Sequence, residues 1–235
     1  MADQYTALGP LGGPLLDVYR RLYRRYGPRH WWPGDSPFET IVGAILTQNT
    51  AWRNAERALA NLKAANALGP ARLRELPQEE LAGLIRPSGY FNMKARKLKA
   101  FADLLGRRHQ DDLDHLFNQE PTALRQELLS IYGIGEETAD DIMVYAAHLP
   151  SFVIDAYTRR IMLRLGMAPQ QQRYEAFQAI FHDNLPHDVQ LFNEYHALLD
   201  RHAKETCRKV PLCGGCILLN LCPTGTAAVG PVPAK

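Results

Sequence analysis

Helical periodicity constrains the fold of this chain more than any other feature. Apolar residues recur at three- and four-residue spacing along most of the 235 residues, and the alternating runs typical of strands are nearly absent. Proline and glycine interrupt the pattern at short intervals. The sequence therefore predicts an all-α fold of about ten helices joined by short turns. The clearest helical segments are residues 38–65, 126–133, 139–149, 158–166 and 174–185.

The composition is that of an ordinary globular protein. Hydrophobic residues make up 46% of the chain and charged residues 22%, and the longest apolar runs are too short to cross a bilayer. The first residues lack the basic and then apolar pattern of a secretory signal. We therefore expect no membrane partner and a cytoplasmic location.

Basic residues gather in two helical runs, although the net charge is only +2. In each run the spacing places the charges along one side of a helix. Either run alone is typical of a solvated helix face, and the two together are suggestive of a polyanionic partner. The runs consist of Arg20, Arg21, Arg24 and Arg25, and of Lys94, Arg96, Lys97 and Lys99.

All the cysteines of the chain fall within sixteen residues, at Cys207, Cys213, Cys216 and Cys222. In a reducing compartment such a group indicates thiolate ligands more than disulfides. Tetrahedral zinc is one candidate, although its sites usually pair two short C-x2–4-C motifs. The compact C-x5-C-x2-C-x5-C loop, with Pro223 directly after it, favours a [4Fe-4S] cluster over the zinc alternative.

A Gly-x-Gly turn, Gly133-Ile134-Gly135, precedes a predicted helix start. Backbone N–H groups at such a turn can bind a phosphate, because glycine permits close approach and the helix end is positive. The next residues are the acids Glu136 and Glu137. Their charges complement the helix dipole by about 0.3–1 kcal/mol.

The hairpin "LLSIYGIGEETAD", the segment "VIDAYTRRIMLRLG" and the cysteine loop together resemble the helix-hairpin-helix DNA glycosylases of the endonuclease III type, over residues 14–222. The resemblance implies a two-domain HhH-GPD fold, with a DNA cleft between a six-helix barrel and a helical iron–sulfur domain. The expected boundaries are 36–148 for the barrel, 1–35 and 149–222 for the cluster domain, and 223–235 for a flexible tail. The implied partner is double-stranded DNA containing damaged bases, bound by a monomer in the bacterial cytoplasm or nucleoid. The family usually has six residues between its first two cysteines, whereas this chain has five.

Two further stretches, "RHWWPGDSPFETIVGAILTQNTAW" and "IRPSGYFNMKARKL", resemble the 3-methyladenine glycosylase III branch of this family. That resemblance implies that Trp31 and Trp52 flank an extruded base, with Pro33 shaping the wall. Trp32 is either a third wall of the base pocket or a core residue. Gln48 matches the family position whose side chain fills the gap left in the DNA stack. Electron-rich rings favour cationic alkylated purines by about 0.5–2 kcal/mol each.

Asp155 matches the family carboxylate that faces the sugar of the flipped nucleotide. Such a carboxylate stabilises the oxocarbenium-like charge that forms as the base leaves, although an aspartate before a helix is also a common N-cap. In bifunctional members a lysine stands two residues after the second hairpin glycine, where this chain has Glu137. A carboxylate cannot form an imine. We therefore expect hydrolysis without strand cleavage, in which Glu137 positions water or only complements the dipole.

Two other functions stay open at this point. One is an oxidised-pyrimidine glycosylase with AP lyase activity from a displaced lysine such as Lys94 or Lys97. The other is a non-catalytic DNA-damage-binding module, against which the presence of Asp155 argues. By family analogy the cluster is not catalytic but shapes a basic loop, in which Arg208 and Lys209 approach DNA phosphates.

Overall fold

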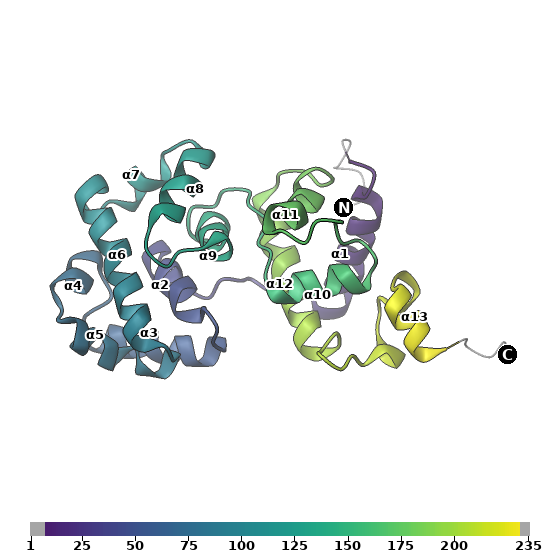
Figure 1. Cartoon of the computed structure of the whole chain (residues 1–235), viewed down its shortest axis with the longest axis horizontal. Helices are drawn as coiled ribbons and strands as arrows, with labels where there is room; N and C mark the ends of the chain where they lie inside the picture. Colours follow the sequence, from purple (N-terminus) through teal and green to yellow (C-terminus); the bar gives the residue numbers. More distant parts are fainter. Residues whose placement is uncertain (1–7, 231–235) are drawn as a thin grey trace. The chain divides into compact units, whose positions relative to one another are not determined.

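The computed structural model describes residues 8–230 and divides the chain into two compact units (Figure 1). The central unit is continuous in sequence and comprises residues 32–149. The terminal unit combines residues up to 31 with those from 150 onward. All regular secondary structure in the described part is helical, which confirms the predicted all-α class.

The central unit is built around helix α2, whose residues from Phe38 to Leu46 are all buried. Helices α3, α6 and α9 and the π-helical turn pack around it. Its helices are α2 (Pro37–Thr47), α3 (Trp52–Ala64), α4 (Pro70–Glu75), α5 (Gln78–Leu84), α6 (Phe91–His109), α7 (Leu113–Phe117), α8 (Pro121–Ser130) and α9 (Glu136–Asp141), with a 3₁₀ turn at Arg86–Ser88 and a π-helical turn at Ile142–Ala146.

Local sequence signals explain where α2 begins. Ser36 is its N-cap and its side chain accepts a hydrogen bond from the backbone N–H of Glu39, at 3.2 Å. Pro37 follows in the first helical position, where its missing N–H costs no hydrogen bond. The apolar run after it has no polar face, which is typical of a helix surrounded by other helices.

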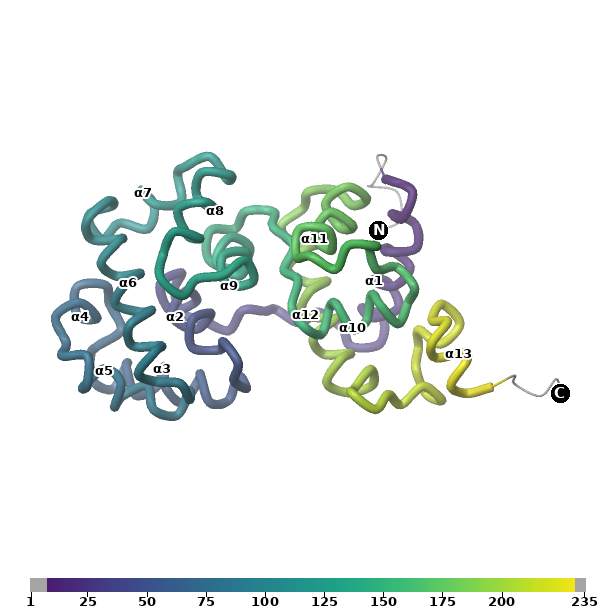
Figure 2. Tube along the Cα trace, viewed as in Figure 1, coloured from purple at the N-terminus to yellow at the C-terminus, as the bar shows by residue number. Residues whose placement is uncertain are grey.

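The terminal unit joins the two ends of the chain. Helix α1 packs on α12, although they are far apart in sequence (Figure 2). The Tyr195 hydroxyl on α12 donates a hydrogen bond of 2.8 Å to the carbonyl of Leu15 on α1. Phe152 stacks on Phe181, with ring centroids 3.6 Å apart, and Phe192 packs edge-on against Phe152. Its helices are α1 (Gly12–Tyr26), α10 (Ala156–Arg164), α11 (Tyr174–His182), α12 (Val189–Glu205) and α13 (Pro223–Val229), with 3₁₀ turns at Cys213–Gly215 and Leu219–Leu221.

Helix α13 differs from the flexible tail expected from residue 223 onward. Pro223 begins the helix, and the Cys222 sulfur accepts a hydrogen bond from the backbone N–H of Gly225. Gly225 is buried against Leu219 and Cys222, so the cysteine loop holds this turn in place. Residues 231–235 of the expected tail lie outside the described residues.

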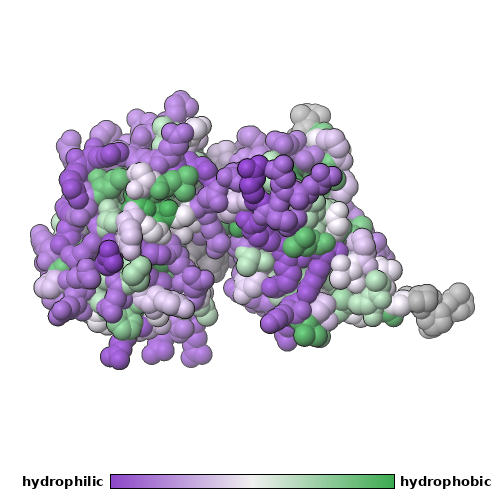
Figure 3. Space-filling view, in the orientation of Figure 1, coloured by the Kyte–Doolittle hydropathy of each residue, from purple (hydrophilic) through white to green (hydrophobic). Residues whose placement is uncertain are grey.

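The visible face of the molecule is mostly hydrophilic, with a group of apolar residues on the central unit (Figure 3). Exposed large apolar residues of this unit include Tyr90, Met93 and Tyr132. Within residues 8–230, no helix is both long and apolar enough to span a membrane.

Candidate functional site

The predicted hairpin lies between α8 and α9 in the central unit. Gly133 has a φ of +82°, a backbone conformation that favours glycine. A Cβ at this position would collide with the alkyl chain of Lys97 on α6. The fold itself therefore requires glycine at position 133.

Gly135 differs from Gly133. Its φ is −98°, any residue can adopt this conformation, and a Cβ there would meet nothing within 4 Å. Neither backbone geometry nor packing within the protein explains a glycine at this position. It is the N-cap of α9, which opens with Glu136 and Glu137, and the Glu137 side chain is exposed.

Gln48 holds the hairpin to the end of α2. Its side-chain amide donates to the Gly133 carbonyl at 3.1 Å and to the Thr138 hydroxyl at 2.8 Å. Its side-chain oxygen accepts from the Lys97 ammonium at 2.5 Å. The amide hydrogens are thus used inside the unit, and this differs from the expected role of Gln48 as a residue inserted into the DNA stack. Sequence reasoning missed this network because the hairpin follows Gln48 by more than eighty residues.

Lys94 is buried rather than on a solvated face, with 2% of its surface exposed. Its ammonium donates to the carbonyls of Leu46 and Ser88, both at 2.8 Å, and so joins the last turn of α2 to the 3₁₀ turn before α6. Burial, with the nearby charge of Lys97, lowers the pKa of Lys94 to about 8. Burial also lowers the pKa of Lys97.

Two of the predicted tryptophans meet in the central unit. The rings of Trp32 and Trp52 are 5.2 Å apart and nearly perpendicular, at 86°, and Trp32 also packs against Tyr145 in the π-helical turn. This edge-to-face contact leaves no room for a base between these two rings. Trp32 is partly buried and packs against the hydrophobic core of the unit. Trp31 belongs to the terminal unit and is half-buried, whereas Pro33 is exposed.

The structure identifies two exposed residues of the central unit, Tyr90, which the sequence did not single out, and Asn49, which it favoured as a structural residue. Tyr90 precedes α6 with 71% of its surface exposed and a φ of +45°. Asn49 follows Gln48 and is likewise exposed, with a φ of +53°. A large side chain in this backbone region costs about 1 kcal/mol or more. The "PSGY" turn, where a bulky residue follows glycine, is the only sequence signal for Tyr90.

Asp155 is the N-cap of α10 in the terminal unit. One carboxylate oxygen, Oδ1, accepts from the backbone N–H of Thr158 at 2.6 Å. The other, Oδ2, lies 3.9 Å from Nε2 of His196 on α12. The preceding residues Phe152, Val153 and Ile154 are buried, so the carboxylate follows directly on a core segment.

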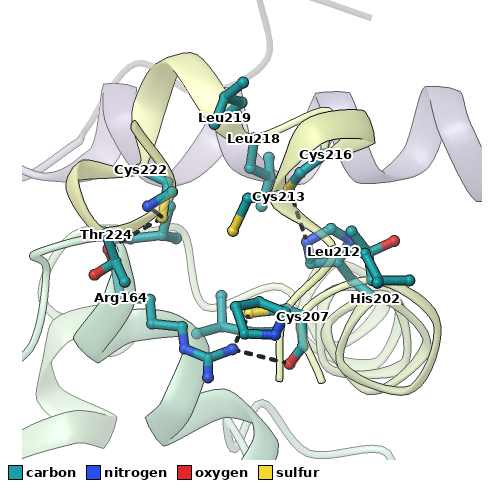
Figure 4. A pocket seen from close by; sticks show the side chains of 15 residues that line it. Arg164, His202, Cys207, Leu212, Cys213, Cys216, Leu218, Leu219, Cys222 and Thr224 are labelled. Atoms are coloured by element: carbon teal, nitrogen blue, oxygen red, sulfur yellow. Dashed lines mark hydrogen bonds between the residues drawn. The ribbon is translucent and has the colours of Figure 1, made fainter. Parts of the chain in front are cut away.

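The four cysteines are free thiols and line a single cavity (Figure 4). Cys207 lies on the opposite side of it from the other three. Apolar side chains supply much of the remaining wall, among them Ile161, Leu165, Leu218 and Leu219. The predicted ligand set is therefore gathered at one place by the end of α12, two 3₁₀ turns and the start of α13.

Hydrogen-bond donors face three of the four sulfurs. The Arg164 guanidinium donates to Cys207 at 3.2 Å, and the Gly225 backbone N–H donates to Cys222 at 3.3 Å. Nε2 of His202 lies 3.6 Å from the Cys216 sulfur. Donors of this kind stabilise thiolates that ligate a metal group.

Within residues 8–230, no three His, Cys, Asp or Glu side chains converge as ligands of a single metal ion do. In a [4Fe-4S] cluster each cysteine binds a separate iron, so four sulfurs spread around one cavity are compatible with such a cluster.

The cysteine loop also carries the predicted basic residues. Arg208 and Lys209 are exposed, and their backbone carbonyls accept hydrogen bonds from Arg164 at 2.7 and 3.0 Å. Arg160 donates to the Cys207 carbonyl at 2.9 Å. Two arginines of α10 thus hold the loop by its backbone, and the side chains of Arg208 and Lys209 are left at the surface.

Comparison with known proteins places this geometry in a family. The model of the HhH-GPD superfamily of base excision DNA repair proteins matches residues 42–187. A relative from Methanocaldococcus jannaschii, described as a putative DNA repair glycosylase (MJ1434), is 42% identical over 209 residues, which cover 88% of this chain and 95% of the relative.

Two solved structures extend the similarity to the fold. The 3-methyladenine DNA glycosylase MagIII of H. pylori, bound to 1,N6-ethenoadenine, is 25% identical with a TM-score of 0.69 and covers 81% of this chain and 97% of its own. A trapped endonuclease III–DNA covalent intermediate has a TM-score of 0.80 at 19% identity, covers 93% of this chain and 99% of its own, and is similar in fold. The chain belongs to the HhH-GPD superfamily of base excision DNA repair proteins.

Proposed function

We propose that this protein is a monofunctional DNA glycosylase that removes an alkylated purine such as 3-methyladenine. The observation that carries the proposal is the carboxylate of Asp155 at the N-terminus of α10. Its Oδ1 caps the helix, whereas its Oδ2 faces His196. A base inside a duplex must be flipped out before its glycosidic bond can be reached. Asp155 then stabilises the positive charge on the sugar and orients the attacking water.

The side chains near the hairpin support hydrolysis over a lyase reaction. Glu137 occupies the position of the attacking lysine in bifunctional relatives, and it cannot form an imine. Lys94 is buried on two carbonyls, and Lys97 is bound to Gln48. Either amine would therefore have to give up these hydrogen bonds before it could attack the sugar. Glu137 itself either positions water or complements the dipole of α9.

The choice of an alkylated purine rests on the aromatic residues and on the similarity to MagIII. We propose that Trp52 packs against the cationic base, with Pro33 at the wall, because aromatic faces attract cations. Trp32 supports Trp52 from the core through the edge-to-face contact.

DNA contacts are assigned to groups that the protein leaves available. Gly135 has the open space that a phosphate needs for close approach to backbone N–H groups, and Gly133 shapes the turn. Arg208 and Lys209 supply charge to phosphates. Asn49 and Tyr90, both exposed and both with a positive φ, are proposed to contact the bases around the extruded nucleotide beside Gln48.

Cys207, Cys213, Cys216 and Cys222 are proposed as ligands of a [4Fe-4S] cluster. Such a cluster would cross-link the loop, and the proposed chemistry does not use it as a reactant. Visible absorbance together with iron and sulfide analysis of the purified protein tests this assignment. One zinc per chain and no iron would instead show that the cysteines bind zinc.

Base release from methylated duplex DNA tests the function. We expect 3-methyladenine to be released by the protein and not by Asp155→Asn, with DNA binding retained in both. Release of thymine glycol alone would show an oxidised-pyrimidine enzyme, and binding to damaged DNA with no release of any base would show a damage-binding module.

Borohydride trapping tests the hydrolytic mechanism. With abasic-site DNA we expect no strong covalent adduct. A strong adduct that disappears on changing Lys94 or Lys97 would establish a lyase and overturn monofunctional action.

A further inference from the structure

The pairing of Asp155 with a histidine on another helix carries an inference beyond the assignment of the carboxylate. His196 lies on α12, which packs against α10, and 9% of its surface is exposed. The side chains of His196 and Asp155 are only 11% and 15% exposed, and 3.9 Å separates Nε2 of the histidine from Oδ2 of the aspartate. The two groups therefore face each other largely away from water, inside one compact unit.

The two carboxylate oxygens of Asp155 have different surroundings. Oδ1 is held by the backbone N–H of Thr158, and Thr158 is fully buried. This bond fixes the position of the carboxylate but leaves its rotation to be set by whatever faces Oδ2. The ring of His196 is an ionisable group that faces that oxygen, with Nε2 at 3.9 Å.

We propose that His196 is a positioning residue for Asp155: its Nε2–H donates to Oδ2 in the DNA complex and holds the carboxylate in the orientation that faces the sugar. Catalytic hydrogen bonds are often long without substrate and tighten only in the complex, and a separation of 3.9 Å is within reach of such a change. The carboxylate stays the group that meets the developing charge, and the histidine acts only through it.

The inference rests on the proposed function, because it gives His196 a role only if Asp155 is the working carboxylate. Chain packing alone offers another role for the ring, that of a space-filling residue between α10 and α12. The two roles differ in what they require of a substitute. A positioning role requires an N–H donor at the place of Nε2, whereas a packing role requires only a ring of similar volume.

Two substitutions separate these requirements. His196→Phe keeps a ring but removes the donor, and His196→Gln keeps an N–H donor near the place of Nε2 but removes the ring. His187→Phe is the matched control, because His187 is an exposed histidine of the same unit. Single-turnover release from methylated DNA and the Kd for DNA with an abasic-site analogue are measured for each, with thermal unfolding as the folding check.

We expect His196→Phe to lower the single-turnover rate by about 10- to 100-fold, the cost of a misplaced catalytic group, with Kd changed by less than about twofold. His196→Gln should recover a large part of the rate, and His187→Phe should match the wild type. The proposal would be overturned if His196→Phe turned over at the wild-type rate or if it lost only DNA affinity. It would also be overturned if His196→Phe and His196→Gln lost the same rate. If His196→Phe does not fold, His196→Ala replaces it as the variant without a donor.

Asp155→Asn, measured in parallel, tells the two failures apart. If Asp155→Asn turns over normally, the proposed function of the carboxylate fails and His196 has nothing to position. If Asp155→Asn loses turnover while His196→Phe keeps it, only the inference about His196 is overturned.

Discussion

Different interactions stabilise the central unit and the cysteine loop of the terminal unit. The central unit surrounds α2 with a continuous apolar core, and its polar network of Gln48, Lys97 and Thr138 sits on that core. From residue 204 to 230, Leu218 is the only buried hydrophobic residue. That loop is held instead by the side chains of Arg160 and Arg164 and by contacts to sulfur.

A segment with few buried apolar side chains offsets little of the entropy of ordering its chain. We therefore expect the cysteine loop to depend on the proposed cluster more than the central unit does. The experiments below test this contrast and the division of chemical roles between the two units.

The largest effect is expected from the carboxylates of the two units. Asp155→Asn should lower the single-turnover excision rate by at least about 10²- to 10³-fold, because the charge that stabilises the transition state is lost. Glu137→Gln should have a much smaller effect if Glu137 only complements the dipole of α9. Base release under single-turnover conditions measures both. Equal losses would instead show that Glu137 takes part in the chemistry.

Loss of one cysteine should affect the terminal unit alone. Cys213→Ala should remove the visible absorbance and make residues 204–230 sensitive to protease, because few apolar contacts hold this segment. Limited proteolysis with mass spectrometry locates the cuts. Val210→Ala is the control, since Val210 lies in the same loop with 79% of its surface exposed. Cuts within residues 32–149 would contradict the contrast between the units.

Lys94 makes the stability of the central unit depend on pH. Its pKa is lowered from 10.5 to about 8 in the folded protein, so between these values the unfolded chain binds more protons. The free energy of unfolding should therefore rise with pH through this window, by about 1 kcal/mol per pH unit. Lys94→Met should remove this contribution. Denaturant unfolding of both proteins across the window gives the two slopes, and equal slopes would refute the assignment.

The two hairpin glycines should respond in opposite ways. Gly133→Ala should lower the free energy of unfolding by at least about 1–2 kcal/mol, because alanine is strained at positive φ and collides with Lys97. Gly135→Ala should change stability by less than about 0.5 kcal/mol but weaken DNA binding, because its Cβ points into open space that a phosphate would enter. Each variant is the control for the other. Unchanged DNA affinity in Gly135→Ala would exclude a phosphate at that glycine.

The smallest effect concerns the surface of the cysteine loop. Replacing both Arg208 and Lys209 by alanine should flatten the salt dependence of DNA binding by up to about two phosphate contacts. The backbone carbonyls that Arg164 binds are kept in this variant, so the loop itself should remain folded. Binding titrations over a range of salt concentrations measure the slope, and an unchanged slope would remove these two residues from the DNA surface.

Much of the site could be predicted because its signals are local. Helical periodicity, the Gly-x-Gly turn, the cysteine spacing and an aspartate before a helix each depend on residues close in sequence. The expected tail shows where this reasoning reached its limit. Residues 223–235 were expected to form a flexible tail, but Pro223 begins a helix that Cys222 and Leu219 hold in place.

Residue roles that depend on distant partners could not be predicted in the same way. Lys94 looked like one member of a basic helix face, but it is buried on the carbonyls of Leu46 and Ser88. Gln48 matched a DNA-inserting position, but the hairpin takes up its amide. In both cases the local pattern is compatible with two environments, and only packing against another segment selects one.

The sequence by itself therefore determined the helical class, the spacing of the four cysteines in their loop and the position of Asp155 before its helix, because each is encoded by spacing along a few turns of chain. Only the tertiary structure decided that Trp32 lies edge-on against Trp52, that glycine is required at position 133 but not at 135, and that His196 faces Asp155. The physical reason is that side-chain partners are chosen when helices pack, and packing brings together residues that no local spacing relates.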